Sequence, residues 1–376
     1  MQNQILTIRQ AARLLQVDPN TIYRWARVGR FPASKIGKEW RILHSDVLEF
    51  VEKHKRKSHF LTEEQTAELV TALAGRRELP LKFQYLGEGA DRFVSFEHTS
   101  EYGIGQTEID LILDNEDKIL SYLSKKEYSV LDIGCGDGKK ATAILTRLER
   151  YSNDKLNYFP VDISARMINI AVDNVQLAHD NLNTESFKED FEKSNFSKVT
   201  YYLRRRYQRD NLILFLGQTI GNLSDSHRVL VNLRESMTED EVMLVGMAML
   251  SKQKDPLEGY DQKIIYDWLW TVPEKIGITR ADADIKLYFN FNKNQIEYKL
   301  EFKKDWAKSY DSDLLNFHKG QKVLIAVSHK FTKDEAFGLF AGAGFKIEMF
   351  LESKKKDYAL VLCRPHSWER QIGRKG

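Results

Sequence analysis

Hydrophobic positions in the first part of the chain recur at helical spacing. From Leu6 to Leu15 they return every three or four residues, which predicts an amphipathic helix. A second helix is predicted from Asn20 to Val28, because Asp18 suits the N-cap and Pro19 suits the first helical position. Two helices joined by a tight turn are therefore expected at the start of the chain.

The residues that follow alternate between polar and apolar as in strands. Residues 31–42 predict a β-hairpin that turns at Gly37-Lys38, and a short helix is predicted after Ser45. Residues 1–57 contain twelve Lys and Arg against five Asp and Glu, so they carry +7 in a chain whose net charge is +3. A basic module attached to a mildly acidic body indicates a local anionic partner.

The segment "LTIRQAARLLQVDPNTIYRWARVGRFPASKIGKEWRI" resembles the excisionase-like, MerR-type winged helix-turn-helix. The resemblance implies that the second helix enters the major groove of double-stranded DNA. The residues expected to contact bases or backbone are Tyr23, Arg24, Arg27, Lys35, Lys38 and Arg41. A small helical domain for protein contacts is the alternative. One such module binds DNA weakly, so a homodimer is a further expectation.

In the rest of the chain, apolar strands alternate with amphipathic helices. A strand from Tyr128 to Ile133 runs into a glycine-rich turn, and a strand from Asn157 to Val161 ends in Asp162. A third strand is expected to end at Asp190-Phe191. The carboxyl ends of parallel strands meet at one edge of a sheet, where open α/β folds bind ligands. The pattern predicts a Rossmann-like α/β fold whose ligand turn contains Gly134, Gly136 and Gly138.

The residues at this edge suit S-adenosylmethionine (SAM). Glycines permit positive φ and a close approach of the backbone to the ligand. Asp162 can accept hydrogen bonds from a ribose diol, while Asp190 can hold an adenine amino group and Phe191 can stack on the ring. The turn has the spacing G-x-G-x-G rather than the dinucleotide G-x-G-x-x-G. The three segments in this order are typical of class I methyltransferases.

From Leu79 to Pro365 the chain resembles the histidine Nα-methyltransferase family of ergothioneine biosynthesis. The resemblance rests on "LPLKFQYLGEGADRFVSF", "EYGIGQTEIDLIL", "LDIGCGDGKK", "LFLGQTIGNL", "KDPLEGYD" and "AVSHKF". It implies that Lys140 pairs with the cofactor's carboxylate. The residues assigned to SAM are Gly134, Gly136, Lys140, Asp162, Asp190, Phe191 and Gly217.

The resemblance also implies an acceptor site. Asn222 matches an asparagine that grips the amine and carboxylate of an amino acid, and the expected catalytic residues are Asn222, Tyr260 and Tyr102. The residues expected to bind the acceptor are Tyr102, Asn222, Tyr260, Tyr298, Ala326 and Ser328. Ala326 stands where histidine-specific members carry an acid that grips the imidazole, and Tyr298 replaces a methionine. A pocket without that acid loses discrimination for an imidazole, so an altered side-chain pocket is expected.

The expected organisation is a winged helix-turn-helix over residues 1–57, a linker and helix over 58–78, a methyltransferase domain over 79–366 and a basic tail over 367–376. Residues 250–322 are expected to form an inserted substrate lobe. The predicted function is SAM-dependent N-methylation of the α-amine of an amino acid or related small molecule, fused to DNA binding.

Two other functions are alternatives to this one. The first is a transcription regulator that senses SAM or an amino acid with little or no turnover. The second, a nucleic acid methyltransferase, is disfavoured because the fourth strand runs into Gly221-Asn222-Leu223 rather than an Asn-Pro-Pro-aromatic segment. No apolar run is long enough to cross a bilayer, and the two cysteines form neither a disulfide framework nor a metal-ligand motif. A cytoplasmic protein that needs no metal and contacts no membrane is expected.

Overall fold

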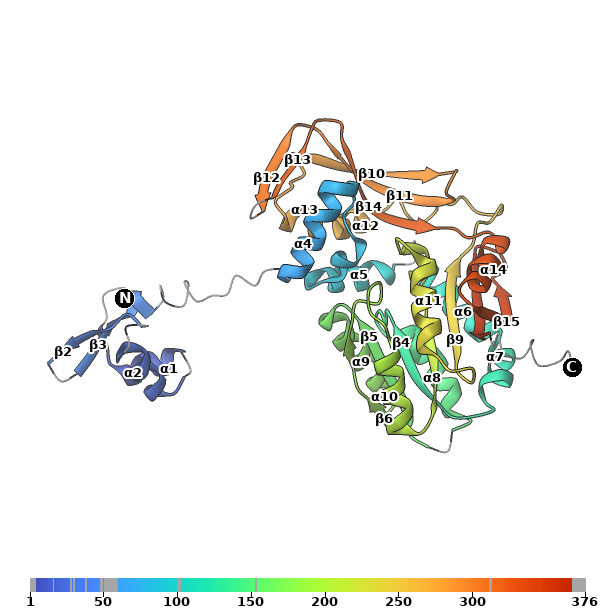
Figure 1. The fold of residues 1–376 in the computed structure, drawn as a ribbon, viewed down its shortest axis with the longest axis horizontal. Helices are drawn as coiled ribbons and strands as arrows, with labels where there is room; N and C mark the ends of the chain where they lie inside the picture. Colours follow the sequence, from blue (N-terminus) through green and yellow to red (C-terminus); the bar gives the residue numbers. More distant parts are fainter. Residues whose placement is uncertain are drawn as a thin grey trace, which may run out of the picture. The chain divides into compact units, whose positions relative to one another are not determined.

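The chain separates into two compact units, Met1–Glu63 and Glu64–Gly376, seen in the computed structural model of Figure 1. The described residues are 5–15, 17–27, 29, 31–37, 39–47, 50, 60–99, 103–152, 154–310 and 313–366. The expected basic tail lies outside these ranges, as do residues 58–59 of the expected linker and helix, whereas residues 60–78 are described. Within the described residues, no helix is both long and apolar enough to cross a membrane.

Among its described residues, the small unit packs two helices and a shorter helical segment at 44–47 on a three-stranded antiparallel sheet. The helices are α1 (Ile8–Leu15) and α2 (Pro19–Arg27), and the strand order is β1 (Ile5–Leu6), β3 (Glu39–Leu43), β2 (Ser34–Ile36). The predicted second helix and hairpin are confirmed. Residues 44–47 are helical where the short helix was predicted, and much of that helix lies outside the described residues. The predicted start of the first helix is wrong, because Ile5-Leu6 pairs as a strand with β3. The core contains Leu6, Ala11, Ala12, Ile22, Phe31, Ile42 and Val47.

The large unit is built on a mixed sheet with the order β15-β16-β9-β8-β4-β5-β6, and β7 also pairs with β5. The strands are β4 (Tyr128–Ile133), β5 (Leu156–Asp162), β6 (Leu182–Thr184), β7 (Phe187–Lys188), β8 (Asp210–Phe215), β9 (Val242–Ala248), β15 (Phe345–Glu352) and β16 (Tyr358–Pro365). Neighbours are parallel except that β16 runs antiparallel to both β9 and β15. The predicted Rossmann-like class I fold is confirmed, and the antiparallel pair β15–β16 closes the sheet at one edge.

Helices cover both faces of this sheet because successive strand residues point to opposite sides. One apolar core joins the sheet to α6 (Ile104–Asp114), α7 (Glu116–Leu123), α8 (Lys139–Glu149) and α9 (Ala165–Ala178). The opposite core joins it to α10 (Ser197–Tyr207), α11 (Ser226–Ser236) and α14 (Lys333–Gly342). Thr332 and Glu335 form a capping box at the start of α14.

A second lobe lies beyond the carboxyl ends of the parallel strands (Figure 1). Its sheet has the order β10 (Ala283–Asn290), β11 (Gln295–Phe302), β14 (Lys322–His329), beside a hairpin of β12 (Trp306–Tyr310) and β13 (Asp313–Phe317). Its helical segments are α4 (Glu63–Thr71), η1 (Ala72–Arg76), η2 (Leu81–Tyr85), α5 (Glu88–Glu97), α12 (Lys263–Leu269) and α13 (Thr271–Lys275). After β14 the chain returns to the main sheet, where Phe331 bridges to Met249.

Candidate active site

A large pocket opens where β4, β5 and β8 end. It contains about 1030 Å³ of space outside the atoms, part of it open to solvent. The glycine turn adopts the expected left-handed backbone, with φ of 67° at Gly134, 54° at Gly136 and 79° at Gly138. All seven residues assigned to SAM from the sequence line this pocket: Gly134, Gly136, Lys140, Asp162, Asp190, Phe191 and Gly217.

Asp162 is fixed at the end of β5 by the start of the next helix. Its Oδ1 accepts a hydrogen bond of 2.8 Å from the Ser164 backbone N–H, and the Ser164 side chain caps α9. Burial raises the pKa of Asp162 to about 7, although backbone hydrogen bonds from Ser164 and Ile163 oppose the shift. A buried carboxyl with spare acceptor capacity suits a hydroxyl-rich ligand.

Lys140, in the first turn of α8, forms a buried ion pair with Glu97 at the end of α5. Burial alone would lower the pKa of Lys140, but the carboxylates of Glu97 and Glu108 raise it above its ordinary value. Oε2 of Glu97 is buried and has no hydrogen-bond partner among the described residues. Glu97 also lines the pocket, so the Lys140–Glu97 pair offers one charge of each sign to a ligand. The sequence prediction missed Glu97.

Asp190 is already engaged by a cation. Its Oδ2 accepts a hydrogen bond of 2.6 Å from Lys82 in η2, and Lys82 also bonds Glu68 at 2.6 Å. The other oxygen, Oδ1, accepts from the Glu192 backbone at 3.1 Å. Each carboxylate oxygen can accept a further hydrogen bond. These contacts therefore orient Asp190 and leave it able to accept hydrogen bonds from a ligand.

A smaller pocket of about 390 Å³ shares Leu81, Tyr85, Phe93 and Asn222 with the first. It is also lined by the predicted acceptor residues Tyr260, Tyr298, Ala326 and Ser328. Tyr102, the remaining predicted acceptor residue, lies outside the described residues. Asn222, at the end of η3 (Thr219–Asn222), therefore lies at the junction of the two pockets.

Aromatic side chains dominate the smaller pocket. Tyr85, Phe93, Phe96 and Trp268 pack with ring centroids 4.8–5.5 Å apart. Tyr298 donates a hydrogen bond of 2.5 Å to the carbonyl of Tyr260, which holds both tyrosines at the pocket wall. Among the described residues that line this pocket there is no Asp, Glu, His, Lys or Arg.

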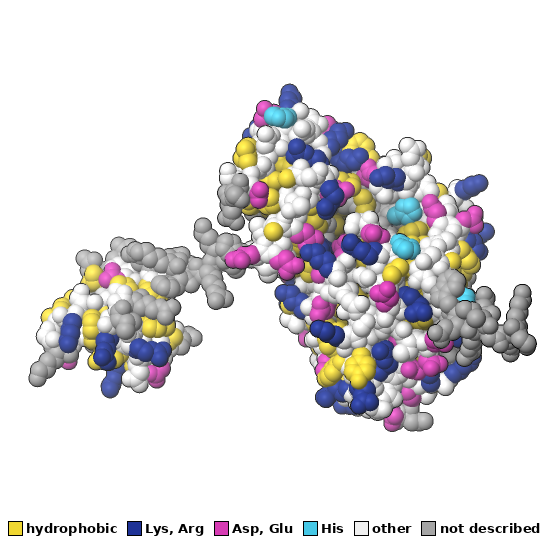
Figure 2. All heavy atoms as spheres, in the orientation of Figure 1, with side chains coloured by type: hydrophobic (Ala, Val, Ile, Leu, Met, Phe, Trp, Pro, Cys, Tyr) yellow, Lys and Arg dark blue, Asp and Glu magenta, His cyan; other side chains and the backbone are white. Residues whose placement is uncertain are grey.

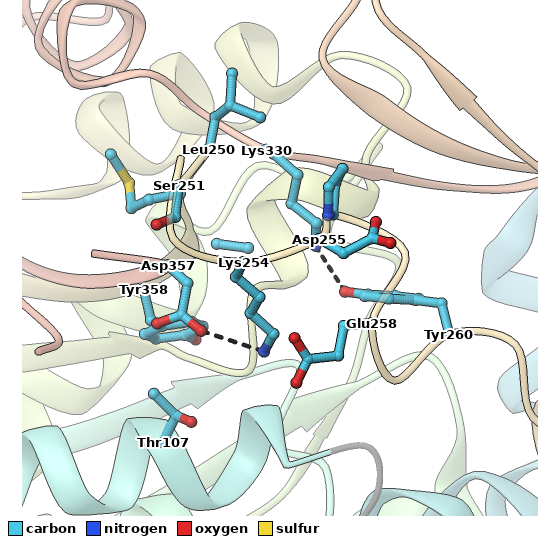
Figure 3. Close-up of a pocket in the computed structure, with 13 residues that line it drawn as sticks. Thr107, Leu250, Ser251, Lys254, Asp255, Glu258, Tyr260, Lys330, Asp357 and Tyr358 are labelled. Atoms are coloured by element: carbon cyan, nitrogen blue, oxygen red, sulfur yellow. Dashed lines mark hydrogen bonds and ion pairs between the residues drawn. The ribbon is translucent and has the colours of Figure 1, made fainter. Parts of the chain in front are cut away.

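A buried polar cluster backs Tyr260. Lys330 donates to the Tyr260 hydroxyl at 2.6 Å and to Ser328 Oγ at 3.2 Å, and its Nζ lies 3.5 Å from Gln218 Oε1. Gln218 Nε2 also donates to the Tyr260 hydroxyl, at 3.0 Å. Figure 3 shows Lys330 directed at Tyr260 from the side of a third pocket. The sequence prediction assigned no role to Lys330 or Gln218, which lie in the motifs "AVSHKF" and "LFLGQTIGNL".

The predicted DNA-contacting residues belong to the small unit. Tyr23, Arg24 and Arg27 are exposed on α2, and Lys35 is exposed on β2. Arg41 on β3 is half-buried and pairs with Glu39, while Lys38 lies outside the described residues. Lys and Arg side chains gather on the visible face of this unit in Figure 2.

Comparisons with known proteins agree with these two parts. Residues 65–365 match the family described as histidine-specific methyltransferase, SAM-dependent, and residues 5–55 match a helix-turn-helix domain. The chain is 22% identical over 305 residues to histidine N-alpha-methyltransferase of Mycolicibacterium smegmatis (strain ATCC 700084 / mc(2)155), covering 77% of this chain and 91% of that protein.

Solved structures give more distant matches. A magnesium protoporphyrin IX methyltransferase from Synechocystis PCC 6803 is 12% identical with a TM-score of 0.41, covering 76% of this chain and 98% of that one. A SAM-dependent methyltransferase from Clostridium acetobutylicum ATCC 824 is 11% identical with a TM-score of 0.39, covering 70% and 92%. Because the family match extends over most of the chain, the protein belongs to the histidine-specific, SAM-dependent methyltransferase family and carries an N-terminal helix-turn-helix domain.

Proposed function

We propose that this protein methylates the α-amine of an amino acid, or of a related small molecule, whose side chain is apolar or aromatic rather than an imidazole. The observation that carries this proposal is the smaller pocket, whose described lining is rich in aromatic side chains and contains no Asp, Glu, His, Lys or Arg. An imidazole N–H buried there would lack a carboxylate partner and would lose part of its hydration. An uncharged aromatic or aliphatic side chain would lose nothing comparable.

In this proposal the large pocket binds SAM and the smaller pocket binds the acceptor. The sulfonium of SAM supplies an activated methyl group, so the protein chiefly binds, orients and excludes water. Gly134, Gly136, Lys140, Asp162, Asp190, Phe191 and Gly217 would hold the cofactor. Asn222, which borders both pockets, would orient the acceptor's amine toward the cofactor, with Tyr260, Tyr298 and Ser328 around the rest of the acceptor.

The test is mass spectrometry of SAM incubated with the full-length protein and a pool of free amino acids. The expected result is a methyl group on an aromatic or aliphatic amino acid, in preference to histidine. Preferred methylation of histidine would contradict the altered pocket. No product, despite measured SAM binding, would favour a regulator that senses its ligand without turnover.

Ala326→Glu sharpens this test by restoring an acid at the pocket wall. A charged hydrogen bond contributes about 1.5–3 kcal/mol, so the preference for histidine, as a ratio of kcat/KM values, should rise about 10- to 100-fold. Ala326→Gln is the matched control, because it adds similar bulk without charge. Equal effects of the two substitutions would show that size rather than charge governs selection.

We also propose that the small unit binds double-stranded DNA through α2 and the β2–β3 wing. The net charge of residues 1–57 and the exposure of Tyr23, Arg24 and Arg27 support this. Replacing Arg24 and Arg27 with Ala should weaken DNA binding and reduce its salt dependence, as measured by fluorescence anisotropy. Arg13→Ala, an exposed charge on α1, is the matched control. An equal loss from the control would contradict the assignment of α2.

A further inference from the structure

An α-amine acceptor brings a proton that has to leave. Such an amine is largely protonated at neutral pH and has no lone pair for the methyl group until the proton is removed. Among the described residues that line the acceptor pocket, the titratable side chains are Tyr85, Tyr260 and Tyr298. If the proposed function holds, the group that takes the proton is to be sought among these three.

Two of the three tyrosines are poor bases. Burial raises the pKa of Tyr85, and the negative charges of Asp162 and Glu97 raise it further. Burial also raises the pKa of Tyr298, whose hydroxyl donates its proton to the Tyr260 carbonyl. Both side chains therefore stay neutral phenols over the range in which enzymes work.

Tyr260 lies in a different environment. Burial would raise the pKa of its phenol, but the Lys330 ammonium, with hydrogen bonds from Lys330, Ser328 and Gln218, brings it below its ordinary value. The donors at 2.6 and 3.0 Å point at the phenol oxygen, an arrangement that favours its ionised form. The Lys330 Nζ also lies 4.6 Å from the centroid of the Tyr260 ring.

Lys330 needs a counter-ion. Its side chain is only 6% exposed, and among the described residues no carboxylate lies within ion-pair distance of its Nζ. An unpaired charge is strongly unfavourable in a protein interior, so a buried lysine is ordinarily held against an anion. A Tyr260 phenolate would supply that anion at 2.6 Å.

We propose that Lys330 holds Tyr260 as a phenolate and that this phenolate removes the proton from the acceptor's ammonium group. The phenolate oxygen forms an O–H bond as the N–H bond breaks, and the nitrogen keeps the electron pair. That pair then attacks the methyl carbon while the carbon–sulfur bond breaks and its electrons return to sulfur. Tyr260 is the catalytic residue, whereas Lys330 is a positioning residue that acts through it.

The proton taken up by Tyr260 can pass to solvent through the third pocket. This pocket has a volume of about 450 Å³ and is lined by Tyr260 and Lys330 together with ionisable and polar side chains, among them Lys254, Asp255, Glu258, Asp357 and Tyr358 (Figure 3). Lys254 pairs with Asp357 at 3.2 Å, while Asp255 and Glu258 are exposed to solvent. Tyr260 thus borders the acceptor pocket on one side and a pocket that opens to solvent on the other, where water can accept its proton.

The first experiment does not depend on methyl transfer. Full-length protein is titrated from neutral to alkaline pH while the ultraviolet absorbance of tyrosinate is recorded, and the curves of wild type, Tyr260→Phe and Lys330→Met are compared. We expect one tyrosine to ionise well below the ordinary pKa of about 10 in the wild type and in neither variant. Lys330→Arg, which retains the charge, should restore the early titration. Superimposable curves would overturn the proposal.

The second experiment uses the acceptor found by mass spectrometry. Tyr260→Phe should lower kcat about 10²- to 10⁴-fold with little change in cofactor affinity. Lys330→Met should move the acid limb of the kcat/KM profile to higher pH. If Lys330→Met instead raises only KM, Lys330 serves as a receptor for the acceptor's carboxylate and the base assignment is wrong. A failure to find any acceptor would count against the proposed function but would leave the titration result standing.

Discussion

Gly246→Ala should damage both the fold and the cofactor site. Gly246 lies in β9 directly beneath two polar side chains from other elements. A Cβ at this position would lie 1.7 Å from Oε1 of Glu108 and 2.6 Å from the Tyr358 hydroxyl, distances at which the neighbours have to move. Glu108 is fully buried on α6, and its Oε2 accepts a 2.8 Å hydrogen bond from the Gly217 backbone in the cofactor pocket.

The size of the effect follows from these contacts. Overpacking a core costs about 1–3 kcal/mol, and a displaced hydrogen bond to a charged group costs about 1.5–3 kcal/mol. We expect the free energy of unfolding to fall by about 2.5–6 kcal/mol, measured by urea denaturation. Moving Glu108 releases the Gly217 backbone, so the dissociation constant for SAM should rise about tenfold, measured by calorimetry.

Gly338→Ala is the matched control for Gly246→Ala. Gly338 lies on the exposed face of α14, where no atom comes within 4 Å of an added Cβ, so the substitution should stabilise the protein by about 0.5–1 kcal/mol. The double variant Gly246→Ala/Glu108→Ala should be less unstable than the sum of the two single changes, because the clash disappears. A Gly246→Ala protein as stable as the wild type would refute the reasoning.

Three further predictions concern charge and capping. Because burial raises the pKa of Asp162 to about 7, lowering the pH through that value protonates the carboxylate and should weaken SAM binding, whereas Asp162→Asn should bind weakly at every pH in calorimetry. Lys140→Met leaves Glu97 buried without its cation and should cost about 3–5 kcal/mol in urea denaturation, with partial recovery in Lys140→Met/Glu97→Gln; an equal loss in the double variant would contradict this. Thr332→Ala removes the capping box of α14 and should cost about 1 kcal/mol without changing SAM affinity, and an unchanged unfolding midpoint would show that the cap contributes nothing.

The parts of the fold that could be predicted depend on local signals. The strand before Gly134, the glycine turn and the helix after it follow from hydrophobic period and backbone freedom within about twenty residues, and β4 and α8 lie where they were expected. The two-residue strand β1 could not be predicted, because Ile5-Leu6 carries too few positions to establish a period and is held in place by β3. Its partner, β3, comes later in the sequence, after both helices.

The residues that sequence reasoning missed depend on distant contacts. Lys330 meets Gln218 across 112 positions, and Lys140 meets Glu97 across 43. A lysine or glutamate at the end of a helix or strand resembles a solvated charge in the sequence, because its burial comes from elements elsewhere in the chain. The signal that could have drawn attention to Lys330 is its place in "AVSHKF", two residues after Ser328.

The proposed cofactor pocket and the proposed acceptor pocket are lined by different parts of the fold. This difference affects how acceptor specificity could change. The cofactor pocket is lined at the ends of β4, β5 and β8, neighbouring strands of one sheet. Much of the acceptor pocket comes instead from α5, α12, β11 and β14 in the second lobe, and Ala326 lies directly opposite Tyr298 in the β11–β14 pairing. A substitution at either position changes a side chain that lines the proposed acceptor pocket while leaving the strand ends of the main sheet intact. Residues 326 and 298 can therefore vary without disturbing the proposed SAM site, and Ala326→Glu should change the choice of acceptor without changing SAM affinity.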